Sequence, residues 1–91
     1  PSRGQNKMPK IEVYCTQTCP YCRMAEALLD RKGVDYSKIF IDGDSEAWSQ
    51  MEARSHRKTV PQIFIGEHHV GGFDDLSALN AAGELDSLLE V

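Results

Sequence analysis

The chain has 91 residues, 41% of them hydrophobic, and a formal net charge of −4 from ten basic and fourteen acidic side chains. This length fits one domain that can bury a compact core, and the hydrophobic fraction argues against intrinsic disorder. No segment approaches the run of about 18 apolar residues that a membrane span needs, and the N-terminus lacks the apolar stretch of a secretory signal. We therefore expect a cytoplasmic protein that binds no membrane, and its acidity argues against nonspecific binding to nucleic acid.

The first residues differ in charge from the rest of the chain. Residues 1–7 hold two of the ten basic side chains and no acidic one. We expect residues 1–7 to be a disordered tail or a remnant of expression, and residues 8–91 to be the folded domain. That domain carries eight basic and fourteen acidic side chains, a net charge of −6, so a local basic cluster within it is informative.

The first half of the chain alternates between strand and helix patterns. Residues 10–14 alternate polar and apolar side chains as a short strand does. Residues 20–32 show helical spacing, and Gly33 follows at the place where a helix end favours a residue without Cβ. Residues 34–41 predict a second strand and residues 46–55 a second helix. Two strands joined by a helix predict a parallel pair with a right-handed crossover.

The second half predicts a hairpin followed by helices. Residues 59–65 are apolar and β-rich but contain Pro61, which cannot donate to a ladder and so marks an edge, a strand start or a bend. A glycine-containing turn leads to a return strand at residues 68–70, and helices are predicted at residues 74–82 and 85–89. The order β-α-β-α-β-β-α predicts an α/β fold with a four-stranded mixed sheet flanked by helices.

Large side chains on the predicted helices and strands can be assigned to core or surface. Met24, Trp48 and Met51 lie at helical core spacing, and we expect all three in the core. His68 and His69 alternate across their short strand, so only one of them could face any site. We expect both histidines to have a surface role.

The pair of cysteines at the first strand-to-helix junction is the strongest chemical signal. The sequence there is Cys19-Pro20-Tyr21-Cys22. The first turn of a helix has unpaired N–H groups and a partial positive charge, so a thiol placed there ionises more readily and becomes the nucleophile in disulfide exchange. Cys19 is predicted to attack, and Cys22, one turn further on and more enclosed, to resolve the mixed disulfide.

The residues alone leave different uses of the cysteines open. With Cys15 the spacing becomes C-x3-C-x2-C, as in the cluster motif of radical S-adenosylmethionine enzymes, but this chain is too short for their barrel. Two further uses are a zinc site that adds His68 or His69 and a purely structural disulfide. A lone C-x-x-C in a cytosolic βαβ setting favours redox chemistry, and we expect Cys15 to be a small buried residue.

The chain carries three separated motifs, which are Cys19-Pro20-Tyr21-Cys22, Thr59-Val60-Pro61 and Gly71-Gly72-Phe73-Asp74-Asp75. In order and spacing they resemble those of the glutaredoxins, and the likeness extends over residues 10–89. The pattern is most similar to the small bacterial dithiol type. The resemblance implies a thioredoxin fold in which the Val60–Pro61 peptide bond is cis.

The resemblance also implies an activity and a set of site residues. The chain would be a glutathione-dependent thiol–disulfide oxidoreductase with Cys19 and Cys22 as catalytic residues. Glutathione would be its co-substrate, with no tightly bound cofactor and no metal. The residues that would bind glutathione are Tyr21, Arg57, Thr59, Val60, Pro61, Gly72, Phe73, Asp74 and Asp75.

Each part of glutathione has an expected partner in this set. By resemblance, Tyr21 forms a wall of the groove and the backbone of Val60 pairs with the cysteinyl part. Helix N-terminal amides of Phe73 and Asp74 suit the γ-glutamyl carboxylate, and the Asp75 side chain suits the ammonium group. The alternative, that Asp74 and Asp75 only cap a helix, is compatible with binding.

A basic island lies directly before the third predicted strand. It consists of Arg54, His56, Arg57 and Lys58, and we expect it to edge the same groove and to attract the glycyl carboxylate, with Arg57 as the principal contact. The alternative is a solvated helix end, where basic residues favour the dipole. Many glutaredoxins have a lysine where this chain has Thr16, which shifts the expected cationic contact further toward Arg57 and Lys58.

The expected partners follow from the proposed chemistry. They are glutathione and proteins that carry disulfides or glutathione mixed disulfides, with ribonucleotide reductase as one candidate, and we expect a monomer. The competing hypothesis is a carrier that holds a [2Fe–2S] cluster between two protomers. In the family, a proline after the first cysteine goes with enzymes that hold no cluster, so Pro20 favours the enzyme.

Overall fold

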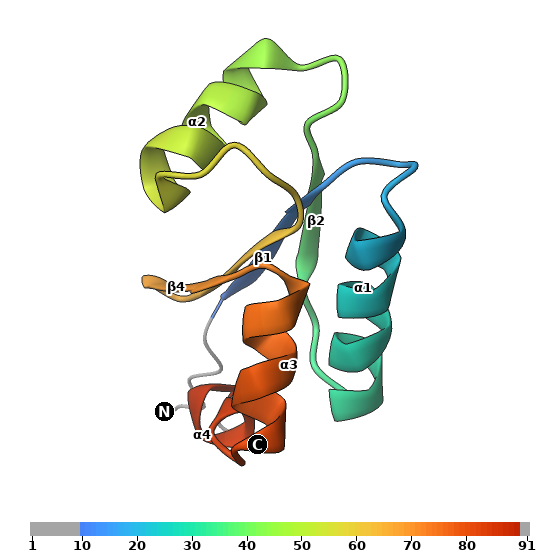
Figure 1. Ribbon diagram of the computed structural model, residues 1–91, viewed down its shortest axis with the longest axis vertical. Coiled ribbons are helices and arrows are strands. Elements are labelled where there is room, and N and C mark those ends of the chain that lie inside the picture. Colours follow the sequence, from blue (N-terminus) through green and yellow to red (C-terminus); the bar gives the residue numbers. More distant parts are fainter. Residues whose placement is uncertain (1–9, 90–91) are drawn as a thin grey trace, which may run out of the picture.

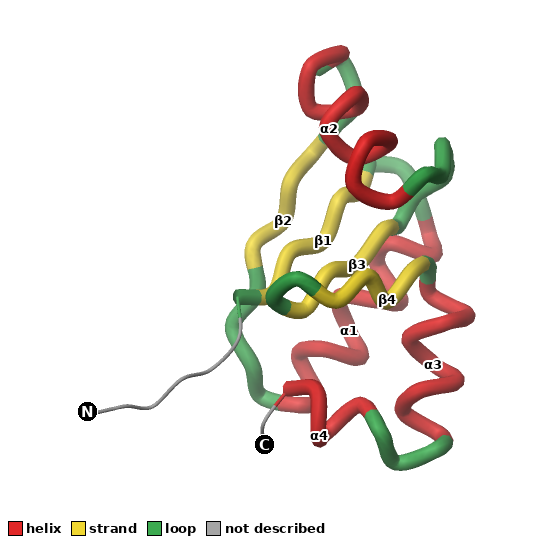
Figure 2. The backbone as a smooth tube through the Cα atoms, turned by 90° about the vertical axis from the view of Figure 1, so that its left-hand side faces the viewer, coloured by secondary structure: helices red, strands yellow, loops and turns green. Residues whose placement is uncertain are grey.

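A computed structural model describes residues 10–89, so the predicted tail at residues 1–7 lies outside the described part. Within it, a mixed sheet lies between helices (Figures 1 and 2). In chain order the elements are β1 (Ile11–Cys15), α1 (Pro20–Lys32), β2 (Ser37–Phe40), α2 (Ser45–Ser55), β3 (Gln62–Ile65), β4 (His68–Gly71), α3 (Phe73–Ala81) and α4 (Leu85–Leu89). Each predicted element is present. No helix within residues 10–89 is long and apolar enough to cross a membrane.

The strand order in the sheet is β2-β1-β3-β4. Strand β1 pairs parallel with β2 and antiparallel with β3, which pairs antiparallel with β4. The first pair is the predicted crossover through α1, and the last is the predicted hairpin. Strand β1 leads through a short loop into the start of α1, so the junction that carries the cysteines lies at one end of the sheet (Figure 1).

Alternation along the strands sends side chains into two cores. Ile11, Val13 and Cys15 of β1 belong to the larger core, which packs against α1, α3 and α4. Tyr14 and Phe64 face the other way, into a smaller core with Met51 of α2. Figure 2 shows the same division, with α2 on one side of the sheet and α1 and α3 on the other. The sheet is therefore covered on both faces, as in α/β folds.

The limits of two strands differ from the prediction. Strand β2 covers only residues 37–40 of the predicted 34–41, because β1 offers it just four paired positions. Strand β3 begins at Gln62 and not at Thr59. Pro61 therefore lies directly before the strand, close to the predicted role of marking a strand start. The Val60–Pro61 bond is cis, as the resemblance implied.

Helix α1 ends as predicted, but one of its apolar residues does not lie in the core. Gly33 takes the left-handed conformation with φ of 73° and closes the helix with a hydrogen bond to the Asp30 carbonyl. The prediction that Met24 is buried is wrong, because its side chain is 45% exposed. The buried stripe of α1 passes through Cys22 and Leu29, and Met24 lies about 200° of helical rotation from Cys22. Trp48 is half-buried and Met51 fully buried, as expected.

Candidate active site

Cys19 is the residue that caps the N-terminus of α1. Its extended backbone places the Sγ atom to accept a hydrogen bond from the Cys22 N–H at 3.3 Å. The same thiol donates toward the Val60 carbonyl oxygen at 3.9 Å. Cys19 is half-buried and its thiol is free, so its sulfur is accessible at the positive end of the helix.

Cys22 differs from Cys19 in exposure and acidity. Its side chain is fully buried in the larger core. Burial and the hydrogen bond with Cys19 raise the pKa of Cys22 to about 12. The expectation that Cys22 is the more enclosed of the two is confirmed, and at neutral pH it is a protonated thiol.

Cys15 is a buried free thiol at the end of β1, as predicted. Burial, with a further contribution from the nearby Glu26 carboxylate, raises the pKa of Cys15. Among residues 10–89, no group of three or more metal-binding side chains is close enough together to hold an ion. Cys15 therefore packs as an apolar side chain does.

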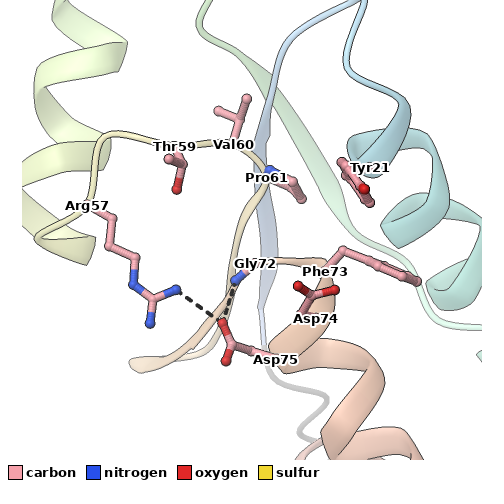
Figure 3. A pocket seen from close by; sticks show the side chains of 9 residues that line it. All are labelled: Tyr21, Arg57, Thr59, Val60, Pro61, Gly72, Phe73, Asp74 and Asp75. Carbon is pink, nitrogen blue, oxygen red and sulfur yellow. Dashed lines mark hydrogen bonds and ion pairs between the residues drawn. The ribbon is translucent and has the colours of Figure 1, made fainter.

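One pocket of about 240 Å³ brings together all nine residues predicted to bind substrate (Figure 3). They come from the start of α1, the loop before β3 and the start of α3. The lining residues are Tyr21, Arg57, Thr59, Val60, Pro61, Gly72, Phe73, Asp74 and Asp75. Val60, one of the lining residues, has its carbonyl oxygen 3.9 Å from Cys19 Sγ, so the pocket lies next to the candidate nucleophile.

The start of α3 gives the pocket a polar end. Asp75 Oδ2 accepts hydrogen bonds from the Gly72 N–H at 3.0 Å and from Arg57 Nη1 at 3.1 Å (Figure 3). These two donors hold the pKa of Asp75 below its usual value. Asp75 thus caps α3, which is the alternative role considered for it. Its side chain stays 47% exposed at the pocket. Phe73 and Asp74 are the first two residues of the helix.

Two aromatic rings form the apolar side of the pocket. The centroids of the Tyr21 and Phe73 rings are 6.4 Å apart, with planes tilted by 35°. Tyr21 is 56% exposed, which is unusual for so large a ring. An apolar wall beside a charged end suits a ligand that has both kinds of surface.

The basic island does not act as one group, and the prediction that Arg54 edges the groove is wrong. Its guanidinium lies over the Phe64 ring, 4.0 Å from the centroid, and donates to Glu12 and to the Tyr14 hydroxyl, both at 3.0 Å. The chain turns between Arg54 and Arg57 because His56 adopts a left-handed conformation with φ of 60°.

His56 and Lys58 are exposed and do not line the pocket either. Arg57 is the member that does, as predicted.

Arg23, which the sequence patterns did not single out, holds the loop that leads to Cys19. Its guanidinium donates to the Thr16 carbonyl at 3.2 Å and to the Gln17 carbonyl at 3.1 Å. It also pairs with the buried Glu26 at 2.7 Å. The spacing of Arg23 and Glu26, three apart on a helix, was the available signal for this ion pair.

Comparison with known proteins agrees with this geometry. A sequence model of the glutaredoxin family matches residues 11–70. The chain belongs to the glutaredoxin family. Glutaredoxin 3 of Escherichia coli strain K12 is 52% identical to this glutaredoxin over 83 residues, which cover 91% of this chain and 100% of that protein. A glutaredoxin of Pseudomonas aeruginosa is 52% identical over 82 residues, covering 90% of this chain and 98% of its own.

Solved structures confirm the thioredoxin fold of this glutaredoxin. The solution structure of glutaredoxin from Brucella melitensis has a TM-score of 0.83 at 49% identity and covers 94% of both chains. The crystal structure of a buckwheat glutaredoxin–glutathione complex has a TM-score of 0.82 at 28% identity, covering 90% of this chain and 77% of the other. The protein is therefore a thiol oxidoreductase, as the motifs predicted.

Proposed function

We propose that this glutaredoxin reduces protein disulfides and glutathione mixed disulfides, with glutathione as the source of electrons. The observation that carries the proposal is the pocket beside Cys19, which combines an apolar wall with a paired guanidinium and carboxylate. Glutathione has a thiol in the middle, an ammonium and a carboxylate at one end and a second carboxylate at the other. The pocket supplies a complementary group for each.

Cys19 carries out the first step. Its thiolate attacks the glutathionyl sulfur of a mixed disulfide, a Cys19–glutathione disulfide forms, and the protein thiolate leaves. A second glutathione thiolate then attacks the glutathionyl sulfur, which gives glutathione disulfide and returns the Cys19 thiolate. Overall, the thiol of the incoming glutathione is oxidised to disulfide level, the protein thiol is released in reduced form, and the enzyme ends unchanged.

Cys22 acts on substrates that are protein disulfides. With a pKa of about 12 it stays protonated at neutral pH and does not compete for the first attack. Once Cys19 is joined to a substrate protein, Cys22 loses its proton and attacks the Cys19 sulfur, and the substrate thiolate leaves. Two glutathione molecules then reduce the Cys19–Cys22 disulfide and become glutathione disulfide.

The pocket residues orient glutathione for these steps. The Asp75 carboxylate takes the ammonium group, and the first N–H groups of α3, at Phe73 and Asp74, take the γ-glutamyl carboxylate. The Val60 backbone pairs with the cysteinyl part next to Cys19, and Arg57 takes the glycyl carboxylate. The buckwheat complex supports glutathione as the ligand of this arrangement, because that glutaredoxin has a similar fold and is in complex with glutathione.

A coupled assay tests the proposal. Glutathione, glutathione reductase and NADPH are supplied with a small glutathione mixed disulfide or with a protein disulfide, and NADPH oxidation is followed. Cys19→Ser should abolish both activities, and Cys22→Ser should keep deglutathionylation while losing reduction of protein disulfides. Equal loss of both activities in Cys22→Ser would contradict the assigned roles.

A visible absorption spectrum distinguishes the proposed enzyme from the alternative, a [2Fe–2S] carrier. Protein purified without air should be colourless in visible light, and an absorption band typical of a cluster would favour the carrier.

The proposed reaction also fits an enzyme of the cytoplasm, where glutathione is kept reduced. Ribonucleotide reductase can be tested there as a disulfide substrate in the same coupled assay.

A further inference from the structure

The loop of residues 57–61 forms one wall of the pocket, the 57–61 wall, but makes few backbone hydrogen bonds of its own. It carries Arg57, Thr59, Val60 and Pro61, four of the nine lining residues. Within the described part of the chain, no backbone-to-backbone hydrogen bond outside the regular elements involves residues 57–61. Something other than secondary structure must therefore hold this wall in place.

A buried hydroxyl holds the start of the loop. Ser55, the last residue of α2, is only 4% exposed. Its Oγ donates to the Met51 carbonyl at 2.7 Å and accepts the Arg57 N–H at 3.1 Å. The hydroxyl thus joins the end of the helix to the backbone that carries the Arg57 guanidinium.

A buried amide holds the other end. Gln62 is fully buried, and its Nε2 donates to the Thr59 carbonyl at 3.0 Å and to the Thr59 hydroxyl at 3.1 Å. Its Oε1 accepts from His69 Nε2 at 2.7 Å, and the His69 ring stacks on Phe64 with centroids 4.9 Å apart. The amide of Gln62 therefore connects the wall of the pocket to the return strand β4.

The polar character of these residues needs a reason beyond packing. A methionine or leucine would suit a fully buried position on β3, and a buried amide is tolerated only when its donors and acceptor are paired. Both donors of Gln62 go to Thr59, a residue of the pocket, and its acceptor to His69. Val60, whose carbonyl lies 3.9 Å from Cys19 Sγ, directly follows Thr59.

We infer that Ser55 and Gln62, with His69 behind Gln62, are positioning residues that fix the 57–61 wall for recognition of the glutathione moiety. The inference rests on the proposed function. Loss of either polar group releases the backbone that presents Arg57 and Val60, while Cys19 and the start of α1 stay as they are. Recognition of glutathione then weakens. The Cys19 sulfur keeps the hydrogen bond from the Cys22 N–H at 3.3 Å and loses at most a long contact of 3.9 Å with the Val60 carbonyl, so its intrinsic reactivity should not fall.

Two variants with a rescue test the inference. Ser55→Ala and Gln62→Met should each raise KM for a small glutathione mixed disulfide about three- to tenfold with kcat within about twofold, as expected for a lost hydrogen bond at about 1.4 kcal/mol per tenfold. Ser55→Thr keeps the hydroxyl and should restore KM. His69→Phe keeps a ring on Phe64 and should show a smaller rise than Gln62→Met.

Two further readouts separate positioning from general damage. The rate at which iodoacetamide alkylates Cys19 should be unchanged in all variants. The rate at which the disulfide of 2-mercaptoethanol, which lacks the tripeptide, oxidises the reduced enzyme in the absence of glutathione should also be unchanged. An unchanged KM for the glutathione substrate in folded Ser55→Ala and Gln62→Met would overturn the inference, as would a parallel fall in alkylation. Failure of the proposed function looks different, because the wild-type enzyme would then not distinguish the two substrates.

Discussion

Replacing Gly71 with alanine should weaken both the fold and the pocket, because of where the added Cβ would lie. Gly71 has φ of +116°, a conformation that L side chains rarely adopt. A Cβ at this position would overlap the carboxylate of Asp75 and lie 3.1 Å from Arg57 Nη1. The substitution therefore strains the backbone and drives Asp75 away from the N-terminus of α3.

The free-energy cost has two parts. An alanine held at this φ costs about 1–3 kcal/mol, and loss of the Asp75 hydrogen bond that caps α3 costs about 1 kcal/mol. The ion pair with Arg57 is half-exposed on both sides, so its loss adds little. We expect the free energy of unfolding to fall by about 2–4 kcal/mol, which leaves a typical domain of about 5–15 kcal/mol folded.

Urea unfolding of Gly71→Ala is compared with that of Gly83→Ala. Gly83 has φ of +78°, close to the left-handed region that L residues can occupy, and no atom lies within 4 Å of a Cβ added there, so its substitution carries only a smaller backbone cost. Gly71→Ala should be the more destabilised by at least about 1 kcal/mol, and it alone should raise KM for a glutathione mixed disulfide. Equal destabilisation of the two variants, or an unchanged KM in Gly71→Ala, would refute the reasoning.

Three more predictions follow from the site. Iodoacetamide at pH 7 should label Cys19 alone, as read by mass spectrometry, because burial raises the pKa of the other two thiols; labelling of all three at similar rates would contradict their burial. Arg54→Ala should lower the free energy of unfolding by about 1–2 kcal/mol and leave kcat/KM unchanged. Arg57→Ala should lower kcat/KM and leave the free energy of unfolding nearly unchanged. Urea unfolding and the coupled assay measure both variants. The pKa of Asp75 is lower in the folded than in the unfolded state, so its contribution to stability is present above about pH 4 and fades as the pH falls through the folded value. Unfolding curves of Asp75→Asn should therefore depend less on pH between about 2 and 5 than those of the wild type.

The fold could be predicted from the sequence because its elements are marked at their ends. Gly33 stops α1, and Pro61 stands directly before β3, so local chemistry agrees with the wider arrangement. The strand at residues 34–41 was predicted too long, because its alternating pattern continues past the positions that β1 can pair. Met24 was predicted in the core because it is apolar and on a helix, although the buried stripe of that helix passes it by.

The pocket could be predicted because its residues belong to three short motifs at element junctions, which the family pattern keeps together. Arg57 could be predicted as the principal contact, but the different position of Arg54 could not, because it depends on the left-handed conformation of His56, which no periodicity indicates. Gln62 was also missed. An amide in an apolar strand has meaning only once its partners on Thr59 and His69 are visible.

The two cores of the sheet differ in size, and this affects how the parts of the site should open. Fourteen buried residues form the core beneath α1, α3 and α4, which includes Cys15 and Cys22, whereas four form the core under α2. The 57–61 wall follows directly from α2, which packs over the smaller core, and Val60 of the wall touches both cores. In native-state hydrogen exchange, amides of α2 should exchange through local opening while those of β1 and α1 wait for global unfolding. The 57–61 wall, which we propose takes part in recognising glutathione, can thus open locally without loosening the part of the enzyme that holds the thiols.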